Sequence, residues 1–470
     1  MPEAIEGAEF SLQNLASNLS LEGLTQLSPD GRALPKLAES WSWANDGLEL
    51  RVLLRKGVTF HDGTPLTAQL AAESLQKAIN SPSNRVLYTS FSDIQKVDAQ
   101  GDHELLIDLA RPSTTLPDDL AVELGETSNG TGPYRVVHQD TSQVELEANE
   151  HYYLGVPQIQ RITVKPFGTL RTAWSSLLRG EVDMVTEVPP DAVEFVQNDE
   201  VQVISFDRRY EYVVAFNSKK PPFNEAVVRR ALNAAINRES LAKGVLKGRG
   251  TPAIGPLWPQ YWAYDRSLPS FGYDPALAMS LLEARGFPER RTSGGPRARF
   301  HFTCLIPSNF SIVERIGLEV QKQLYDVGVD MRFEVVPPKD LDARIRSGRF
   351  DALLIEMLSG PTPSRAYMFW RSAKTFHGLN VFGYENPEAE RLFGVLRSTT
   401  NEAAIRSATR NLQRVLLDDP PALFLAWTQR SRAVRRDFQI VQEPGRDPVD
   451  LVFTIWRWAP GGAEAAVATK

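Results

Sequence analysis

The sequence has a single cysteine, Cys304, among 470 residues. One thiol excludes an internal disulfide and a four-thiolate zinc site. Cys304 lies in the apolar run 300–306, which predicts a buried strand. We therefore expect a packed thiol rather than a nucleophile, because a free cysteine behaves as a small hydrophobic side chain.

Long apolar runs are also absent. No stretch approaches the roughly 20 residues that a membrane-spanning helix needs. Residues 1–7 are acidic and lack the basic region and apolar core of a signal peptide, and no cysteine follows for a lipid anchor. We therefore expect no signal peptide in this chain. The sequence leaves open a mature chain, a misplaced start and a cytoplasmic location.

The chain lacks a basic excess and any recognisable catalytic pattern. Its formal charge of −6 gives no footprint for nucleic acid. None of the six histidines has the H-E-x-x-H spacing for zinc, and G-x-S-x-G and G-x-x-x-x-G-K are missing. His61 and Asp62 could belong to a metal phosphohydrolase, but no further ligands accompany them. We expect His61 to be a loop residue that bonds its own turn.

Two adjacent carboxylate pairs give no better support for an enzyme. Asp118-Asp119 and Asp418-Asp419 would face apart on helices, so we expect solvated surface. The string 130–133 is not a dinucleotide fingerprint, because Arg135 stands where a glycine is required. No catalytic residue, metal or cofactor is predicted, and an enzyme is the least favoured class.

The stretch 35–67 has the densest structural signals. Trp41 and Trp43 are two residues apart, so on a strand both rings face one side. Residues 45–47 (Asn-Asp-Gly) predict a turn, and 48–54 predict a second strand. Thr67 is a candidate cap for a helix over 68–79. The stretch therefore predicts a hairpin that leads into a helix.

The rest of the chain alternates between helices and strands. A helix over 169–179 should end at Gly180, and one long helix is expected over 225–246. The segment 111–129 is expected to be a short polar connection, and the Gly- and Pro-rich segment 248–259 to be a domain crossing. The alternation over 300–356 predicts a second α/β domain.

Several ordered motifs carry a resemblance. They are Leu-Ala-Glu-Ser-Trp at 37–41, the run 54–67, Gly-Thr-Gly-Pro-Tyr at 130–134, N-x-x-Y at 149–152, the element 216–223, the helix 228–241 and the loop 380–388. Together they resemble the signature of the family 5 extracellular solute-binding proteins. These proteins are the peptide-, nickel- and oligosaccharide-binding components of ATP-binding-cassette (ABC) importers.

The resemblance implies an α/β, periplasmic-binding-protein-like fold, with two lobes joined by a hinge and an extra inserted α+β domain. Domain I would comprise residues 1–20, 157–256 and 437–470, the last with a frayed C-terminus. Domain II would be the inserted lobe, 21–156, and domain III would span 257–436. The expected crossings between lobes are 253–257 and 431–438.

The implied function is capture of a small solute, whether peptide-like, oligosaccharide or other, in an interlobe cleft. Delivery would be to the transmembrane subunits of an ABC permease with a separate ATPase. The resemblance implies a monomer in the periplasm or another extracytoplasmic space, with no nucleic-acid partner. The alternative is a cytoplasmic solute sensor that reuses the fold, although no helix-turn-helix domain precedes residue 20.

The resemblance also nominates residues of the cleft, with core packing as the alternative for each. The nominated side chains are Tyr210, Tyr212, Asn380, Tyr384, Phe424 and Trp427. Peptide-binding members carry an aspartate that pairs with the peptide's amino group, but the corresponding segment 355–365 has none. We therefore expect that peptides are not bound by their amino end.

Arginines and aromatic residues follow that segment instead. Arg365, Trp370 and Arg371 are further candidates, with Tyr367 beside them. A guanidinium group is a good partner for a carboxylate or phosphate, because its fork binds two oxygens. A surface salt bridge is the alternative role for each arginine.

Overall fold

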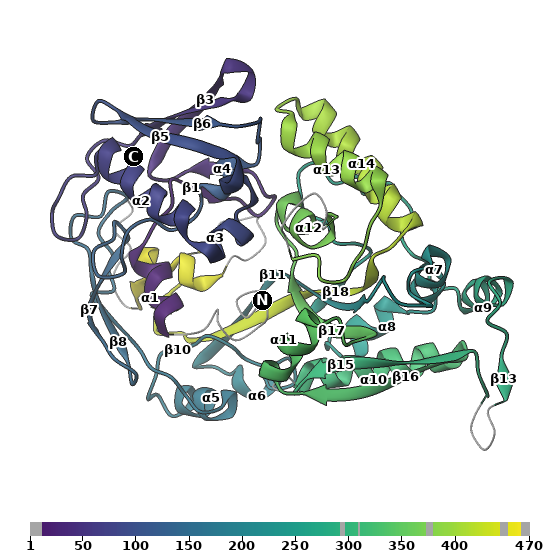
Figure 1. The fold of residues 1–470 in the computed structure, drawn as a ribbon. Helices are drawn as coiled ribbons and strands as arrows, with labels where there is room; N and C mark the ends of the chain where they lie inside the picture. The colour runs from purple at the N-terminus through teal and green to yellow at the C-terminus, as the bar shows by residue number, and fades with distance from the viewer. Residues whose placement is uncertain (1–11, 292–296, 309–310, 373–378, 442–449, 462–470) are drawn as a thin grey trace.

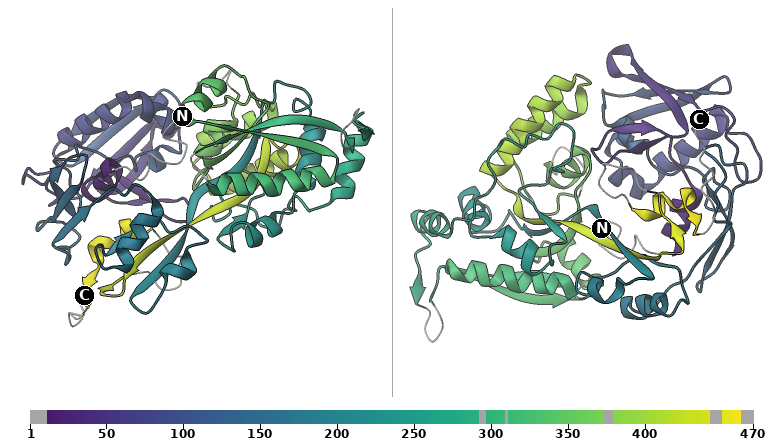
Figure 2. Two further views of the ribbon diagram at one scale, coloured as in Figure 1. Left: turned by 90° about the horizontal axis from the view of Figure 1, so that it is seen from below. Right: turned by 180° about the vertical axis from the view of Figure 1, so that it is seen from behind.

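The computed structural model describes residues 12–291, 297–308, 311–372, 379–441 and 450–461. The chain forms two lobes, joined by the long strands β11 (Val201–Phe216) and β18 (Ala422–Arg435) (Figure 1, Figure 2). We call residues 12–205 and 431–461 the first lobe and residues 210–428 the second lobe. In the described residues, no helix is long and apolar enough to cross a membrane. The end predicted to be frayed, 462–470, lies outside the described residues.

The inserted part of the first lobe is built on a four-stranded antiparallel sheet in the order β3-β4-β6-β5. The hairpin is as predicted, since β3 (Ala38–Ala44) pairs with β4 (Glu49–Leu54) around the turn at 45–47. Thr67 caps α2 (Ala68–Asn80), because its side chain accepts the Leu70 N–H at 3.3 Å. The other elements here are β1 (Thr25–Leu27), β2 (Ala33–Pro35), α3 (Pro82–Leu87), β5 (Ile94–Gln100), β6 (Glu104–Leu109) and α4 (Leu116–Asp119).

The segment 111–129 is not the polar connection that the sequence predicts. It contains α4, and Leu116, Leu120 and Leu124 join the core of the inserted sheet. Solvated surface is also wrong for one carboxylate of each pair. Asp119 is 4% exposed and accepts hydrogen bonds from the Ser90 N–H and hydroxyl, at 2.9 and 2.6 Å. Asp419 pairs with the buried Arg229.

A second core of the first lobe joins the two ends of the chain. It packs α1 (Leu12–Ser20) between the sheet β7-β8-β9 and the C-terminal turns η5 (Leu451–Phe453) and η6 (Ile455–Arg457). The helix predicted over 169–179 is confirmed as α5 (Leu170–Leu178), with Gly180 in the left-handed region after it. The remaining elements are β7 (Tyr134–Gln139), β8 (Val144–Ala148), β9 (Arg161–Val164), β10 (Met184–Val185), α6 (Val193–Val196), β19 (Phe438–Gln439) and β20 (Ala459–Pro460).

The second lobe is organised on a sheet in the order β10-β18-β11-β17-β15-β16, with β12 beside β18. The predicted α/β alternation is confirmed: β15 (Phe300–Pro307), α10 (Ser311–Asp326), β16 (Val329–Val336), α11 (Pro338–Arg346) and β17 (Ala352–Leu358). The pairs β15·β16 and β15·β17 are parallel. The predicted packed thiol is also observed, since Cys304 lies fully buried on β15. The other elements are β12 (Gly250–Pro252), β13 (Arg290–Arg291), β14 (Arg297–Ala298), α12 (Pro363–Trp370), α13 (Pro387–Ser398) and α14 (Glu402–Asp418).

The single helix predicted over 225–246 is wrong. The segment forms α7 (Ala226–Ala234) and α8 (Arg238–Gly244), which are separated by residues 235–237. The Asn237 side chain accepts the Ser240 N–H at 2.9 Å, and its own N–H donates to Gln323 Oε1 at 2.7 Å. Both bonds begin a new helix at that point. Residues 212–246 share a core with α9 (Pro275–Ala284) and α10.

Two of the motifs that carry the family resemblance, 130–134 and 149–152, meet inside the first lobe at Glu22. Its carboxylate is 4% exposed and accepts hydrogen bonds from Thr131 Oγ1 (3.0 Å), Tyr152 (2.9 Å) and Tyr153 (3.2 Å). Lys36 Nζ lies 2.9 Å away as the counter-ion. We call these five residues the Glu22 cluster; it joins four segments that are far apart in the sequence.

His61 supports the same region. Its Nδ1 accepts the Gly130 N–H at 3.2 Å, so its Nε2–H donates to the Gly132 carbonyl at 3.0 Å. The expectation that His61 bonds its own turn is therefore wrong, because it holds a loop about 70 residues away. A Cβ atom at Gly130 would lie 1.9 Å from the Ser20 carbonyl oxygen, which explains why a glycine is needed there.

Candidate functional site

Strands β11 and β18 form the connection on which the two lobes can move. They pair antiparallel from Val201↔Arg435 to Ala215↔Ala422, with an irregularity between Asp207 and Glu211. The predicted crossing 431–438 overlaps the end of β18. The structure places the other predicted crossing, 253–257, in the second lobe, where the buried Ala253 donates its N–H to the Leu425 carbonyl at 3.2 Å.

The described residues of the two lobes touch at several places, among them the pair of Arg315 with Asp191 at 3.5 Å. Three sets of contacts form the junction, and the first is centred on Arg397 of α13. Its guanidinium forms a buried ion pair with Asp93 of the first lobe and donates to the Thr89 carbonyl at 3.2 Å. It also donates to the Tyr367 hydroxyl at 2.5 Å. The Arg397 carbonyl accepts the Thr114 N–H from the first lobe at 2.7 Å. We call this set of contacts the Arg397 latch.

The second contact joins the loop 28–32 to the segment 258–262. Trp258 Nε1 donates to the Pro29 carbonyl at 3.0 Å, and the Arg32 guanidinium lies 4.3 Å from the centre of the Trp262 ring. Gly31 has a φ of +80°, and a Cβ atom there would lie 2.5 Å from the Pro361 carbonyl oxygen. The two lobes approach so closely at Gly31 that a side chain would separate them.

The third contact is made by Arg209 of β11 and Arg365 of α12. Arg209 donates to the Leu27 carbonyl at 3.4 Å, and Arg365 donates to the Leu87 carbonyl, so both guanidiniums reach the first lobe. Burial and then the neighbouring Arg365 charge lower the pKa of Arg209 to about 10. Within the described ranges, neither guanidinium forms an ion pair with a carboxylate.

Beside this contact, Glu211 is fully buried on β11. Burial raises the pKa of its carboxyl well above the usual range, and the Ser359 hydroxyl is the polar neighbour that opposes the shift. Neither carboxyl oxygen has a hydrogen bond of normal geometry in the part of the chain that the structure describes. Glu211 lies opposite Trp427, which packs edge to face on Trp258 at 4.8 Å. The junction of the lobes therefore combines aromatic surface with buried ionisable groups.

The nominated tyrosines on β11 are buried. Tyr212 belongs to the core that packs α7, α9 and α10. Tyr210 lies beneath the Arg208 guanidinium, 3.7 Å from its ring centre, and Arg208 pairs with the buried Glu356 at 2.5 Å. Both tyrosines thus face the opposite side of β11 from Val213. The Val213 side chain lies in a separate core of the second lobe, which also contains Trp258 and Trp427.

The other nominated residues divide into two groups. Arg365 and Trp427 lie at the junction of the lobes, as described. The second group lies in the second lobe: Trp370 stacks on Phe382 at 5.3 Å and packs on Phe424, Asn380 donates to the Tyr384 carbonyl at 2.7 Å, and Arg371 pairs with Glu390. These contacts stabilise the 380–384 loop, and a ligand role for this group stays a prediction.

Sequence reasoning missed Arg209, Glu211, Trp258 and Arg397. One signal was available, because 207–211 places four charged residues in the middle of a strand that is otherwise apolar. Buried charges of this kind need partners, so their presence in a central strand indicates a special site. For Arg397 the sequence has no such signal, since its partner Asp93 is 304 positions away.

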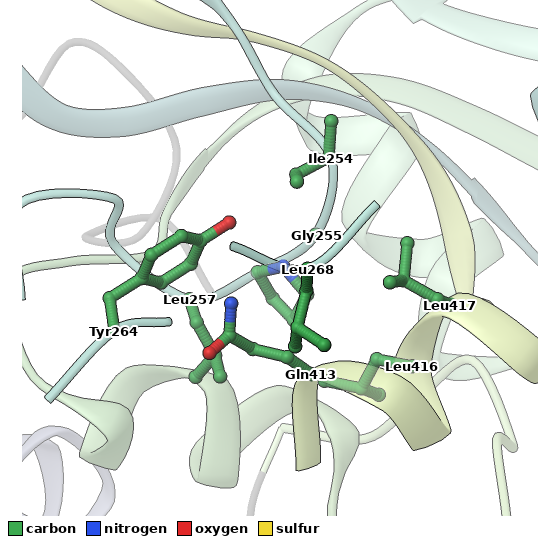
Figure 3. Close-up of a pocket in the computed structure, with 9 residues that line it drawn as sticks. Ile254, Gly255, Leu257, Tyr264, Leu268, Gln413, Leu416 and Leu417 are labelled. Carbon is green, nitrogen blue, oxygen red and sulfur yellow. The ribbon is translucent and has the colours of Figure 1, made fainter. Parts of the chain in front are cut away.

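A pocket lined by Ile254, Leu257, Tyr264, Gln413 and Leu416 lies within the second lobe, behind the junction (Figure 3). Its volume of about 20 Å³ has room for one water molecule and is too small for a peptide or sugar. A pocket of about 450 Å³, lined by Asp340, Ala343, Arg344 and Arg349, lies elsewhere in the second lobe. The junction remains the candidate solute site because residues of both lobes meet there.

Comparison with known proteins adds the family. Residues 32–377 match the model of the bacterial extracellular solute-binding proteins, family 5. The chain is 27% identical to the glutathione-binding protein GsiB of Pectobacterium atrosepticum, covering 89% of this chain and 85% of that protein. It is 25% identical to the oligopeptide-binding protein AppA of Bacillus subtilis, covering 90% and 82%. Among solved structures, NikA from Brucella suis, in complex with Fe(III)-EDTA, superposes with a TM-score of 0.83 at 20% identity, covering 97% of this chain and 96% of NikA.

Proposed function

The chain belongs to family 5 of the bacterial extracellular solute-binding proteins, and from this premise we propose that it captures its solute where the two lobes meet beside β11 and β18. Proteins of this family bind small solutes or peptides and work with ABC permeases, outside the cytoplasm. The protein is accordingly a binding protein and not an enzyme, and its fold is the expected periplasmic-binding-protein type.

The observation that carries this proposal is the set of three contacts between the lobes. Side chains of the second lobe reach carbonyl groups of the first at Pro29, Leu27 and Leu87. In the described part of the chain, the paired strands β11 and β18 continue from one lobe to the other, and their pairing is irregular between Asp207 and Glu211. Such a connection suits a hinge whose closure buries a solute between the lobes.

We propose a peptide-like solute, because GsiB and AppA bind glutathione and oligopeptides. The segment 355–365 has no aspartate for a peptide's amino group, and its one carboxylate, Glu356, is paired with Arg208. The solute's amino end would therefore not be its main anchor. We further propose that the protein acts as a monomer, because both walls of the proposed site come from one chain.

Thermal unfolding and calorimetry with glutathione and with tri- and tetrapeptides test the proposal. A solute at 100 times its Kd stabilises the folded state by about 2.7 kcal/mol, which raises the unfolding temperature measurably. Light scattering on the same sample gives the mass for comparison with the 52.4 kDa chain.

A matched pair of variants locates the site. Trp258→Ala removes an aromatic side chain from the junction and should weaken binding. Phe195→Ala removes a ring that is 74% exposed on α6, and it should bind as the wild type does. Equal affinities for the wild type and Trp258→Ala would contradict capture at the junction.

A further inference from the structure

We propose that Arg209 and Arg365 together form a subsite for an anionic group of the solute, a carboxylate or a phosphate. This inference rests on the proposed capture between the lobes and names the chemistry of what is captured. It follows from where the two guanidinium groups lie and from the partners that they have.

The position of Arg209 is set by the sheet and by the loop after β17. Its carbonyl accepts the N–H groups of Ser359 and Gly360, at 3.0 and 3.1 Å. Its side chain leaves β11 at the irregularity before Glu211 and reaches the first lobe, where Leu27 O accepts a long hydrogen bond of 3.4 Å. The backbone is therefore held firmly, while the guanidinium has one weak neutral acceptor.

Arg365 approaches the same place from α12. It donates to the Leu87 carbonyl, and its guanidinium carbon lies 5.5 Å from the centre of the Tyr88 ring. Its charge is close enough to Arg209 to contribute to the lowered pKa of that residue. Arg209 of the crossing strand and Arg365 of the second lobe thus both reach the first lobe, with carbonyls as their hydrogen-bond acceptors.

The other buried arginines of the crossing strands each pair with a carboxylate. Arg208 pairs with Glu356 at 2.5 Å, Arg430 with Glu187 at 2.8 Å, and Arg432 with Asp450 at 2.5 Å. A charge removed from water needs a counter-charge, and this fold supplies one for each of these three. Arg209 and Arg365 form no ion pair with a carboxylate in the described residues, so an anion of the solute would complete the site.

The opposite wall does not supply the missing negative charge. Two carboxylates of the first lobe act on these cations, Asp119 on Arg365 and Asp450 on Arg209. Both Asp450 oxygens already accept hydrogen bonds from the Arg432 guanidinium, at 2.5 and 2.6 Å. Burial raises the pKa of Asp119. Its Oδ2 accepts both the Ser90 N–H and the Ser90 hydroxyl. The guanidinium forks therefore remain available for two oxygens of a planar carboxylate or a phosphate.

Calorimetry with two pairs of probes tests the subsite. Glutathione is compared with its diethyl ester, which lacks both carboxylates, and glucose 6-phosphate is compared with glucose. Wild type should bind one anionic member on the order of tenfold to one hundredfold more tightly than its partner, as expected for hydrogen bonds to a charged group. We call that partner the neutral probe because the tested group, an ester or a hydroxyl, carries no charge. The pair that shows this preference identifies the anion as a carboxylate or a phosphate.

Arg209→Gln and Arg365→Gln should each remove most of that preference, with little change for the neutral probe. Arg391→Gln is the matched control, because Arg391 is an exposed arginine on α13 that pairs with Glu388. Trp258→Ala should weaken the charged and neutral probes equally, since it reports on capture alone. If wild type binds both members of each pair equally, or if the glutamine variants keep the preference, the proposed subsite is wrong. If Trp258→Ala then loses affinity equally for both members of a pair, capture between the lobes would still be supported.

Discussion

Removing the Arg397 side chain should shift the protein toward an open form. Arg397 of the second lobe is bonded to Asp93 and Thr89 of the first lobe, and these two contacts would be lost if the lobes moved apart. Arg397→Met keeps the length of the side chain and removes its charge and its donors. The variant therefore weakens the closed form and leaves the covalent hinge unchanged.

The size of the shift follows from the burial of Asp93. Its side chain is 1% exposed, and breaking a buried ion pair by removal of one partner costs about 3–5 kcal/mol. Arg111 also forms an ion pair with Asp93, at 2.5 Å, so the Asp93 carboxylate keeps one counter-ion in the variant. We therefore expect a cost at the lower end of this range, about 3 kcal/mol, which lowers the equilibrium constant for closure roughly a hundredfold.

Small-angle scattering and calorimetry together measure this effect. Without solute, Arg397→Met should have a larger radius of gyration than the wild type. Its affinity for glutathione should fall by up to the same hundredfold, because the apparent Kd rises as the competent fraction falls. Arg391→Met, on the same helix, should change neither quantity. A variant with wild-type radius and wild-type affinity would refute a latch at Arg397.

Three further outcomes are expected. Burial lowers the pKa of His61 below 6.5. Near pH 6.5 the folded protein therefore binds fewer protons than the unfolded chain, and its stability should decrease as the pH falls through 6.5. Between pH 5 and 7.5, the urea midpoint should change less steeply with pH in His61→Asn than in the wild type. Burial raises the pKa of Glu211 above 4.5, so the protonated carboxyl contributes fully to the free energy of unfolding below pH 4.5, and this contribution is lost as the pH rises. The stability of Glu211→Gln relative to wild type should therefore increase between pH 5 and 8. A difference in stability that does not change with pH would contradict this. N-acetylation of a bound tripeptide should change its calorimetric affinity by less than about threefold, well under the tenfold that 1.4 kcal/mol represents, whereas a large loss would show that the amino end is an anchor.

The parts of the fold that could be predicted are those specified by neighbouring residues. Thr67 caps α2 because the acceptor and the Leu70 N–H are one turn apart. The turn at 45–47 and the alternation over 300–356 were predictable for the same reason. Each depends on contacts within a few residues, and such contacts leave a local pattern.

The parts that failed depend on distant contacts. The break in the helix at Asn237 requires Gln323, which is 86 positions away, and the burial of Asp119 requires Ser90. The candidate site is of this kind. Trp427 was nominated by resemblance, and Arg365 by its guanidinium group in the segment where the resemblance breaks. The partners of Arg209 and Arg397 come from the other lobe, so their roles follow only from the fold.

The Glu22 cluster has a consequence for how solutes are assigned within the family. All five of its residues belong to the first lobe, whereas the cations proposed to hold the solute, Arg209 and Arg365, come from the crossing strand β11 and from the second lobe. A chain can therefore change its cargo and keep the two motifs, 130–134 and 149–152, that meet in this cluster. Overall sequence identity reflects the shared scaffold. The residues at positions 209 and 365 are the better guide when the solute of one relative is assigned to another.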